Sequence, residues 1–311
     1  MEKAREIIAN ISRVIIGKED VITTLLTGIL CNGHLLIEDV PGVGKTTLVK
    51  ALATTLGCSF KRIQFTPDLM PSDIIGLSLY DKDRGEFIFK PGPIMSQVVL
   101  ADEINRTSPK TQASLLEAMA ERQVTVDGVS HMLPSPFLVI ATQNPVEYEG
   151  TYPLPEAQLD RFMMCIRIGY PGHEEEKTIV KLRPGGSLPA ELPAVISPAR
   201  LLHMQKQAGD VYLAPSLESY IVSLTRNTRS HREVLLGVSP RGGQYLFQAA
   251  KAAAYIQGSD HVLPDHIKKM TGPVFAHRLI LKPEARLKGS TAENVLEDIL
   301  QKTSVPVVLD D

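Results

Sequence analysis

Cysteine is scarce in this chain, which has only three cysteines among its 311 residues. Cys31, Cys58 and Cys165 lie far apart and form no C-x-x-C pair, so the sequence predicts neither a disulfide framework nor a cysteine metal site. Each of them falls in an apolar run, which favours a reduced, buried side chain. The eight histidines show no metal-binding spacing either, and His261 and His266 would lie on different faces of a helix.

A strong charge of either sign and a long apolar run are also missing. The formal net charge is −2, so the composition lacks the basic excess of a nucleic-acid-binding protein. The most apolar stretch, residues 21–37, is interrupted by Asn32, Gly33 and His34 and falls short of a membrane-spanning helix. The first residues are charged, unlike a signal peptide. We therefore expect a soluble, cytoplasmic protein with no nucleic-acid partner and no stable membrane insertion.

A glycine-bearing turn between an apolar strand and a helix is the most informative feature of the sequence. Residues 35–38 predict a buried strand, and residues 48–53 read as a helix. In this context glycines let backbone N–H groups close around phosphate oxygens, and the helix N-terminus adds favourable partial charge. Lys45 would reach the β- and γ-phosphates, and Thr46 would ligate Mg²⁺. The predicted nucleotide-binding residues of this phosphate loop are Pro41, Gly42, Val43, Gly44, Lys45, Thr46 and Thr47.

The loop departs from the general pattern G-x-x-x-x-G-K-[ST] at its first position, where this chain has Asp39. The second half of the pattern, which supplies the amides and the lysine, is intact. A glycine-rich turn with a chance Lys-Thr pair is the alternative interpretation. The flanking strand and helix favour the phosphate loop, and Asp39 then bears only on the strength of binding.

Strand and helix patterns alternate through the first half of the chain. The apolar runs that read as buried parallel strands are residues 35–38, 60–64, 98–101, 137–141 and 163–168, with helical segments at 47–56 and 110–121. This alternation predicts an α/β fold with a parallel five-stranded sheet covered by helices. Two hairpins interrupt it at residues 76–89 and 123–129, each with Asp and Gly in its turn. They are either surface decoration or elements that face a pore or a partner.

The alternation of predicted strands and helices ends after Gly172. A helix opens at Glu174, and a Pro/Gly-rich linker follows at residues 183–189. Beyond Ser197 helical segments fill the chain at residues 198–208, 215–230, 240–257 and 264–276. We therefore expect two domains, an α/β core over residues 1–193 and a small all-α lid domain over residues 194–311.

Polar side chains end two of the predicted strands. Residues 98–101 run directly into Asp102 and Glu103, and residues 138–141 lead to Asn144. Beside a phosphate loop, Asp102 would hold Mg²⁺ through its water shell, and Glu103 would polarise the attacking water. Asn144 would position that water or sense the γ-phosphate, although a residue before Pro145 is also a common turn position.

Together these motifs resemble those of AAA+ ATPases, and specifically of the MoxR family. The residues that carry the resemblance lie, in chain order, at 38–46, 102–106, 115–125, 141–145, 154–162 and 237–241. The similarity covers almost the whole chain. It implies a P-loop NTPase core of the AAA+ type, with two hairpin inserts near the pore of a ring, followed by a helical lid. Asp39 fits the phosphate-loop variant of this family.

The resemblance also implies roles for residues outside the phosphate loop. Arg161 matches the arginine finger that one subunit inserts into its neighbour's site, and an intramolecular ion pair with Asp160 or a nearby carboxylate is the alternative. Arg241 matches the sensor 2 arginine, which couples the lid to the γ-phosphate. Gly17 matches the segment that flanks the adenine, although glycine before an acidic helix start is also ordinary capping. The predicted catalytic residues are Glu103, Asn144, Arg161 and Arg241, and the predicted magnesium ligands are Thr46 and Asp102.

The function that the resemblance implies is Mg²⁺-dependent ATP hydrolysis by a hexameric ring that binds ATP and ADP. Family relatives act as chaperone-like maturation factors, often for partners with von Willebrand factor A domains. A motor subunit of a metal-chelatase-like complex is the closest alternative, because such motors share this branch and its inserts. A nucleotide-dependent assembly switch is another, but switches usually lack the residues that match Glu103 or Arg161. A DNA-directed motor would need basic hairpin tips, and here acidic residues offset Lys82 and Arg84.

Overall fold

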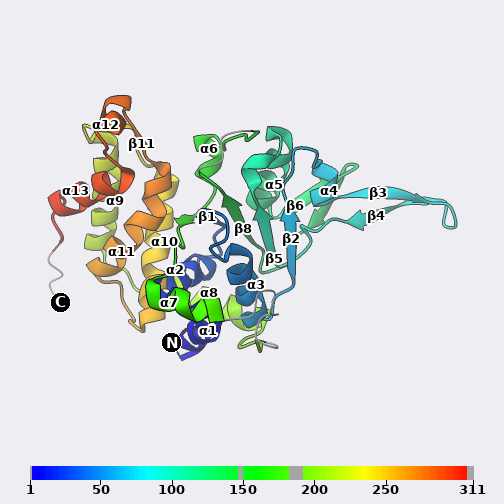
Figure 1. Cartoon of the computed structure of the whole chain (residues 1–311), viewed down its shortest axis with the longest axis horizontal. Helices are drawn as coiled ribbons and strands as arrows, with labels where there is room; N and C mark the ends of the chain where they lie inside the picture. The colour runs from blue at the N-terminus through cyan, green and yellow to red at the C-terminus, as the bar shows by residue number, and fades with distance from the viewer. Residues whose placement is uncertain (1, 146–149, 182–191, 307–311) are drawn as a thin grey trace.

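The computed structural model describes residues 2–145, 150–181 and 192–306, so the predicted linker at residues 183–189 lies outside the described residues. Five strands form one parallel sheet in the order β2-β5-β8-β1-β9 (Figure 1). They are β1 Leu35–Glu38, β2 Phe60–Gln64, β5 Val98–Asp102, β8 Leu138–Gln143 and β9 Met164–Ile166. The predicted α/β fold with a five-stranded parallel sheet is confirmed.

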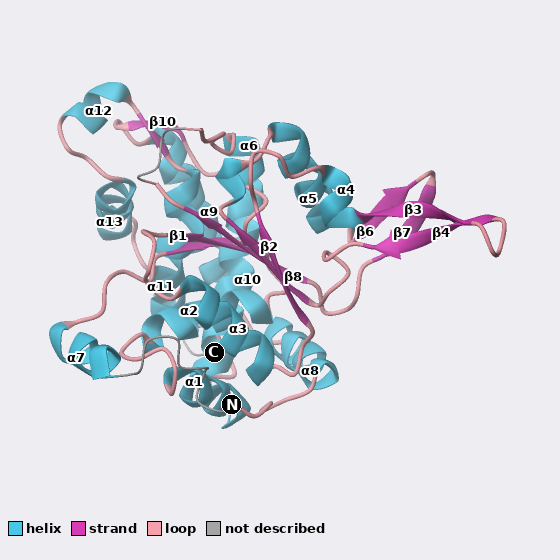
Figure 2. Ribbon diagram, turned by 45° about the vertical axis from the view of Figure 1, so that its right-hand side comes forward, coloured by secondary structure: helices cyan, strands magenta, loops and turns pink. Residues whose placement is uncertain are grey.

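Successive residues of the central strands face two different hydrophobic clusters, because side chains alternate across a strand. Leu35 and Ile37 of β1 belong to the larger cluster, whereas Leu36 between them belongs to the smaller one. Figure 2 shows helices on both sides of the sheet. The larger cluster is covered by α1 Glu2–Ser12, α2 Glu19–Leu30 and α3 Lys45–Thr55, and the smaller by α5 Pro109–Glu121. Burial on both faces explains why these strands read as continuous apolar runs.

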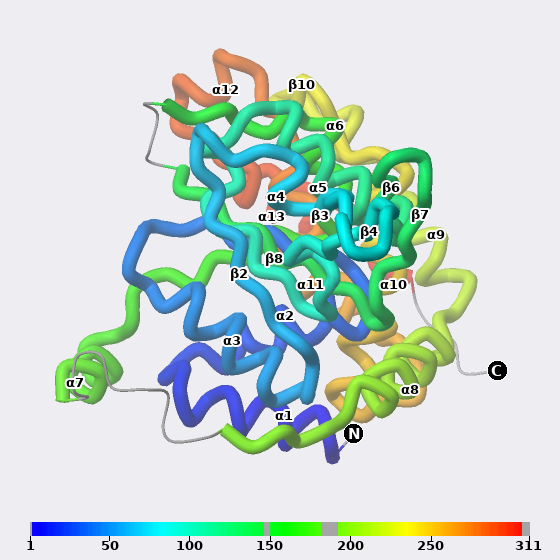
Figure 3. Tube along the Cα trace, turned by 90° about the vertical axis from the view of Figure 1, so that its right-hand side faces the viewer, coloured from blue at the N-terminus to red at the C-terminus, as the bar shows by residue number. Residues whose placement is uncertain are grey.

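Two antiparallel hairpins leave the sheet where the sequence predicted them. They are β3 Gly76–Asp81 with β4 Glu86–Pro91, which the short helix α4 Pro71–Ile75 precedes, and β6 Gln123–Val126 with β7 Val129–Met132. The ring of Phe89 stacks on His131 with centroids 3.8 Å apart, so the hairpins lie side by side (Figure 3). The first hairpin projects farthest from the sheet (Figures 1 and 2).

The part of the chain beyond residue 193 is mainly helical, as predicted. Its predicted helices are α8 Pro198–Gly209, α9 Pro215–Ser230, α10 Pro240–Gln257 and α11 Pro264–Phe275. Each begins with proline, which has no N–H to leave unsatisfied at that position. In the ranges that the structure describes, no helix combines the length and the apolar character needed to cross a membrane.

Several short elements have no counterpart in the sequence predictions. They are the 3₁₀ turns Ile104–Arg106 and Ala276–Arg278, the helices α6 Glu156–Leu159, α12 Pro283–Leu287 and α13 Ala292–Lys302, and the strand pair β10 Val234–Leu236 with β11 Ile280–Leu281. The helix expected near Glu174 is α7 His173–Lys181. Most of these elements carry too few residues for a hydrophobic period to be recognised. The exception is α13, which has 11 residues and buries Val295, Leu296 and Ile299 on one face, so its period was present in the sequence and was missed.

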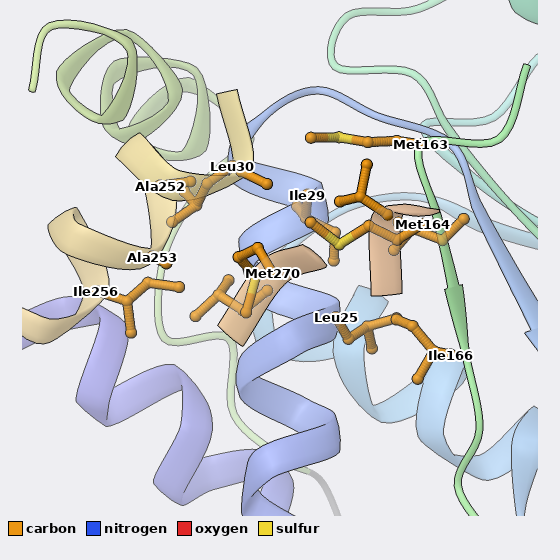
Figure 4. Packing of buried hydrophobic residues seen from close by; sticks show 14 of the residues in the cluster. Leu25, Ile29, Leu30, Met163, Met164, Ile166, Ala252, Ala253, Ile256 and Met270 are labelled. Atoms are coloured by element: carbon orange, nitrogen blue, oxygen red, sulfur yellow. The ribbon is translucent and has the colours of Figure 1, made fainter. Parts of the chain in front are cut away.

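The helical region packs directly against the sheet and its covering helices. Figure 4 shows Leu25 and Ile29 of α2 close to Met164 of β9 and Met270 of α11. One hydrophobic cluster contains buried side chains from both sides of residue 193. Hydrogen bonds also cross this point, since the amide of Val195 donates to the carbonyl of Thr55 at 2.8 Å and Gln205 Nε2 donates to the carbonyl of Ile29 at 2.8 Å. The boundary near residue 193 stays a prediction, and the two parts of the chain share a core.

Candidate nucleotide-binding site

The phosphate loop, the acidic pair and Asn144 meet at one edge of the sheet. Strands β5, β8 and β1 are parallel neighbours, so their carboxyl ends lie together. The phosphate loop follows β1, Asp102 ends β5, and Asn144, which is buried, follows β8. The pairing of Glu38 with Gln143 brings the ends of β1 and β8 level. Ligands of open parallel sheets bind at this edge.

The phosphate loop has the geometry of an anion-binding turn. Gly42 and Gly44 have φ angles of 87° and 86°, in the left-handed region that glycine adopts most readily. An added Cβ at either position would meet no heavy atom within 4 Å, so backbone conformation rather than space requires glycine. Gly44 is the N-cap of α3, and the first amides of this helix donate no hydrogen bond to a capping side chain. Those free amides and the positive end of the helix fit a phosphate group.

Lys45 lies at the start of α3 and turns back onto its own loop. Its Nζ donates to the carbonyls of Asp39 at 2.6 Å and Val40 at 3.2 Å. Burial lowers the pKa of Lys45, and the nearby charges of Asp39, Asp102 and Glu103 oppose that shift. The ammonium group therefore lies among three carboxylates, where phosphate oxygens could replace the two carbonyl acceptors. Both threonines that follow it are partly buried.

Asp39 ties the phosphate loop to the segment that follows β9. Its Oδ2 accepts the amide protons of Ile168 and Gly169, each at 2.7 Å, and its Oδ1 accepts that of Val40 at 2.9 Å. Charge-assisted bonds of this kind are about twice as strong as neutral ones. The glycine of the general pattern could not form them. Asp39 therefore has a structural role in the loop, which the sequence alone did not indicate.

Asp102 is buried, and both of its carboxylate oxygens have protein partners. Arg62 of β2 donates to Oδ2 from Nε at 3.0 Å and from Nη2 at 2.6 Å, and Thr142 of β8 donates to Oδ1 at 2.6 Å. Among the described residues, no group of three or more His, Cys, Asp or Glu side chains could hold a metal ion. Thr46 and Asp102 would thus hold Mg²⁺ together with phosphate oxygens and water, as this ion prefers.

Glu103 has a left-handed backbone, with φ 57° and ψ 50°, which is uncommon outside glycine and concentrates at functional sites. Its amide donates to Thr142 Oγ1 at 2.9 Å. Its Oε2 accepts from Gln64 Nε2 at 2.8 Å and from Arg106 Nη1 at 3.1 Å. The carboxylate predicted to polarise water is therefore held in place by two side chains.

Sequence reasoning missed Arg62, Gln64 and Thr142, which hold the acidic pair. A usable signal existed in β2, where Arg62 and Gln64 alternate with Ile63 and so share one face of the strand. The pairing of Gln64 with Asp102 sets that face beside the acidic pair. Without the strand order, however, nothing in the sequence says which strand lies next to β5.

Gly17 lies beside the segment that Asp39 binds. The next residue, Lys18, donates from Nζ to the carbonyl of Tyr170 at 2.7 Å, and Tyr170 follows Gly169. Gly17 has a φ of 70°, and a Cβ there would lie 1.9 Å from Oε1 of Glu175. The structure therefore brings Gly17 to the same side as the phosphate loop.

Arg161 and Arg241 lie together near the opposite edge of the sheet. Arg161 precedes β9, whose first residue pairs with Leu35 at the start of β1. The phosphate loop follows the other end of β1, which is roughly 13 Å away for a strand of this length. Arg241 is in the first turn of α10, and the helix cap Ser239 donates to both oxygens of Asp160, at 3.1 and 3.0 Å. The structure thus separates both arginines from the phosphate loop of their own chain.

The ion pair considered as the alternative role of Arg161 is not formed among the described residues. Asp160 pairs instead with Nε of Arg278 at 2.8 Å. The side chain of Arg161 is partly buried, and its amide donates to the carbonyl of Gln158 at 3.1 Å.

The chain matches two described families and several known proteins. Residues 34–164 match the "ATPase family associated with various cellular activities (AAA)", and residues 226–299 match the "AAA lid domain". YeaC of Bacillus subtilis is 50% identical over 300 residues, covering 96% of this chain and 94% of that protein. Chaperone MoxR1 of Mycobacterium tuberculosis is 40% identical over 310 residues, covering 97% and 82%. A solved structure from Cytophaga hutchinsonii has a TM-score of 0.91, 41% identity, and coverage of 98% and 96%.

Proposed function

Because this chain belongs to the MoxR-type AAA+ ATPases, we propose that it hydrolyses ATP with Mg²⁺ as a hexameric ring and remodels partner proteins. The name of the mycobacterial relative, a chaperone, supports the remodelling role. Within this proposal the partners carry von Willebrand factor A domains and the ring works in the cytoplasm.

One subunit supplies the general base and the groups that bind the phosphates. Amides of the phosphate loop and Lys45 bind the phosphate groups, and Thr46 and Asp102 would hold Mg²⁺. Glu103 takes up the proton of the attacking water, and Asn144 orients that water beside it. The chemistry that Mg²⁺ would supply there is neutralisation of negative charge on the phosphate groups. The common sheet edge of these residues supports this assignment.

The neighbouring subunit supplies the arginines, and the observation that carries the proposal is their position. Arg161 and Arg241 lie near the edge of the sheet opposite their own phosphate loop, and this position supports a role at a nucleotide across a subunit interface. In a head-to-tail ring, that face of one subunit meets the nucleotide edge of the next. A trans arginine offsets the charge of the transition state and is worth about 10³–10⁵ in rate. Within this proposal, Arg241 acts as sensor 2 on the neighbour's nucleotide.

The two hairpins are the proposed contact for partner proteins. Large hydrophobic side chains are exposed on both of them, namely Leu77, Leu79, Tyr80, Phe87, Val129 and Met132. Clustered exposed apolar side chains mark interaction surfaces. A Phe87→Ala variant should keep basal ATPase activity and lose stimulation by a client, whereas Lys82→Ala at the hairpin tip should lose neither.

The alternatives differ from this proposal in what they predict. A metal-chelatase-like motor would share the ATPase chemistry, and only its partner protein separates the two. An assembly switch would bind ATP and oligomerise without turnover, and the presence of Glu103 and Arg161 argues against it.

The direct test of the chemistry is the steady-state ATPase rate of a Glu103→Gln variant. Removal of the base should lower turnover by about 10²–10⁴-fold while ATP binding persists. The matched control is Glu117→Gln, an exposed glutamate of α5, which should turn over like the wild type. Wild-type turnover by Glu103→Gln would disprove the assigned base. Affinity purification of the same variant with ATP should retain client proteins and identify them.

A further inference from the structure

Arg278 lies at the junction between the helical region and residues 160–163, which we term the finger segment. Its side chain is 2% exposed. Nε donates to Oδ1 of Asp160 at 2.8 Å, and Nη2 donates to the carbonyls of Asp160 at 3.2 Å and Phe162 at 2.5 Å. Nη1 donates to the carbonyl of Met163 at 3.2 Å. One guanidinium therefore binds the main chain on both sides of Arg161.

The same cluster fixes the start of α10, which carries Arg241. Asp160 accepts from Arg278 and also from Ser239, the N-cap of that helix. Gly242 leaves the space that Arg278 crosses, because a Cβ there would lie 3.0 Å from the Cδ of Arg278. The guanidinium carbon of Arg278 lies 5.1 Å from the ring centre of Tyr245, within cation–π range. The finger segment and the first two turns of α10 thus form one packed unit.

We propose that Arg278 is a positioning residue of the shared active site, which holds Arg161 and Arg241 as one rigid pair facing the neighbouring subunit's nucleotide. This inference rests on the proposed trans site. Arginine suits the task because its planar fork presents five donors in fixed directions, which lysine cannot imitate. Arg278 is far from its own phosphate loop in the fold, so its influence on hydrolysis passes through the two arginines.

The test is an Arg278→Lys variant, which keeps the positive charge next to Asp160 and loses the fork. Its own phosphate loop is intact, so ADP should bind with the wild-type dissociation constant. Its ATPase rate should fall about 10²-fold, the loss expected when a catalytic group is displaced by about 1 Å. Asp160→Asn, close to isosteric, is a second variant that should give the same pattern if Arg278→Lys does not fold.

Mixed rings separate positioning from simple stabilisation. Two variants are co-expressed with different tags and purified through both, so every ring contains both subunits. Arg278→Lys with Lys45→Ala should regain activity, because the second subunit offers intact arginines to the first subunit's phosphate loop. Arg278→Lys with Arg161→Ala should stay inactive, because both lack the same half of the site.

The pair Arg161→Ala with Lys45→Ala is the reference for these rings. Suppose that this reference pair regains activity. The positioning role of Arg278 is then overturned, and the shared site stands, if Lys45→Ala fails to rescue Arg278→Lys. The same conclusion follows if Arg161→Ala does rescue Arg278→Lys. If the reference pair itself stays inactive, the trans site is overturned and this inference falls with it.

Discussion

The carboxylate of Asp39 accepts the amide proton of Gly169 across 2.7 Å. Asp39 opens the phosphate loop, and Gly169 lies just beyond the strand at the edge of the sheet. The bond therefore joins the loop that would cradle phosphate to the segment next to Gly17, which we expect to flank the base. A position that looks like a defect of the phosphate-loop pattern holds the two ends of the predicted nucleotide site together.

Asp39→Gly restores the general pattern and is expected to weaken nucleotide binding. The change removes three hydrogen bonds to a carboxylate, each worth about 1.5–3 kcal/mol when its partner stays buried, and part of this loss falls on the loop. We expect the dissociation constant for ADP to rise about 10-fold, which corresponds to about 1.4 kcal/mol. Isothermal titration calorimetry measures this dissociation constant. Asp39→Asn keeps one acceptor and should be intermediate, and tighter binding by Asp39→Gly would contradict the account.

Two helical glycines offer a matched pair for the packing around Arg278. A Cβ at Gly242 would lie 2.3 Å from the Cγ1 of Val238, whereas a Cβ at Gly272 of α11 would meet no heavy atom within 4 Å. Gly242→Ala should lower the free energy of unfolding by about 1–3 kcal/mol through overpacking. Gly272→Ala should raise it by up to about 1 kcal/mol through helix propensity. Urea denaturation measures both, and a shift in the same direction would contradict the structure.

His34 makes folding stability depend on pH. Its Nδ1 accepts the amide proton of Val139 at 3.0 Å, so the ring is neutral in the folded state. Burial, with help from the charge of Arg122, lowers the pKa of His34 to about 3. An unfolded histidine has a pKa of about 6.5, so between these values the unfolded state binds more protons. The free energy of unfolding should therefore decrease as pH falls through this window.

For one such histidine, the free energy of unfolding changes by up to about 1.4 kcal/mol per pH unit below pH 6. The contribution of His34 is measured by comparing the free energies of unfolding of the wild type and of His34→Gln at pH 7, 6 and 5. The variant should be less stable at pH 7 and should lose less stability on acidification. Equal slopes for the two proteins would show that His34 does not titrate on unfolding.

Local patterns were enough to predict the sheet, the hairpins and the main helices. The apolar runs ending at Glu38 and Asp102 are strands because both faces of the sheet are covered. Proline starts the four helices that were predicted in the C-terminal part, whereas α13, which begins at Ala292, was missed. The glycine turn between β1 and α3 was predictable because its conformation depends on neighbouring residues in the chain.

Contacts between distant residues could not be predicted in this way. Arg278 and Asp160 are 118 positions apart, and neither lies in a motif that names the other. The partners of Asp39, at Ile168 and Gly169, depend on β9 pairing with β1, which no local pattern reports. The position of Arg161 on the opposite edge likewise follows from sheet order. The alternative role of Arg161, an ion pair with Asp160, agreed with the local sequence, but in the structure Asp160 pairs with Arg278.

The measurement that tests the central claim most directly is the ATPase rate of rings that contain both Arg161→Ala and Lys45→Ala subunits. Each variant alone should be inactive. With random mixing in a head-to-tail ring, roughly one site in four combines an intact phosphate loop with an intact arginine, so roughly a quarter of wild-type activity should return. Mixed rings that stay as inactive as either variant alone would show that the arginine serves its own subunit, and would contradict the shared site.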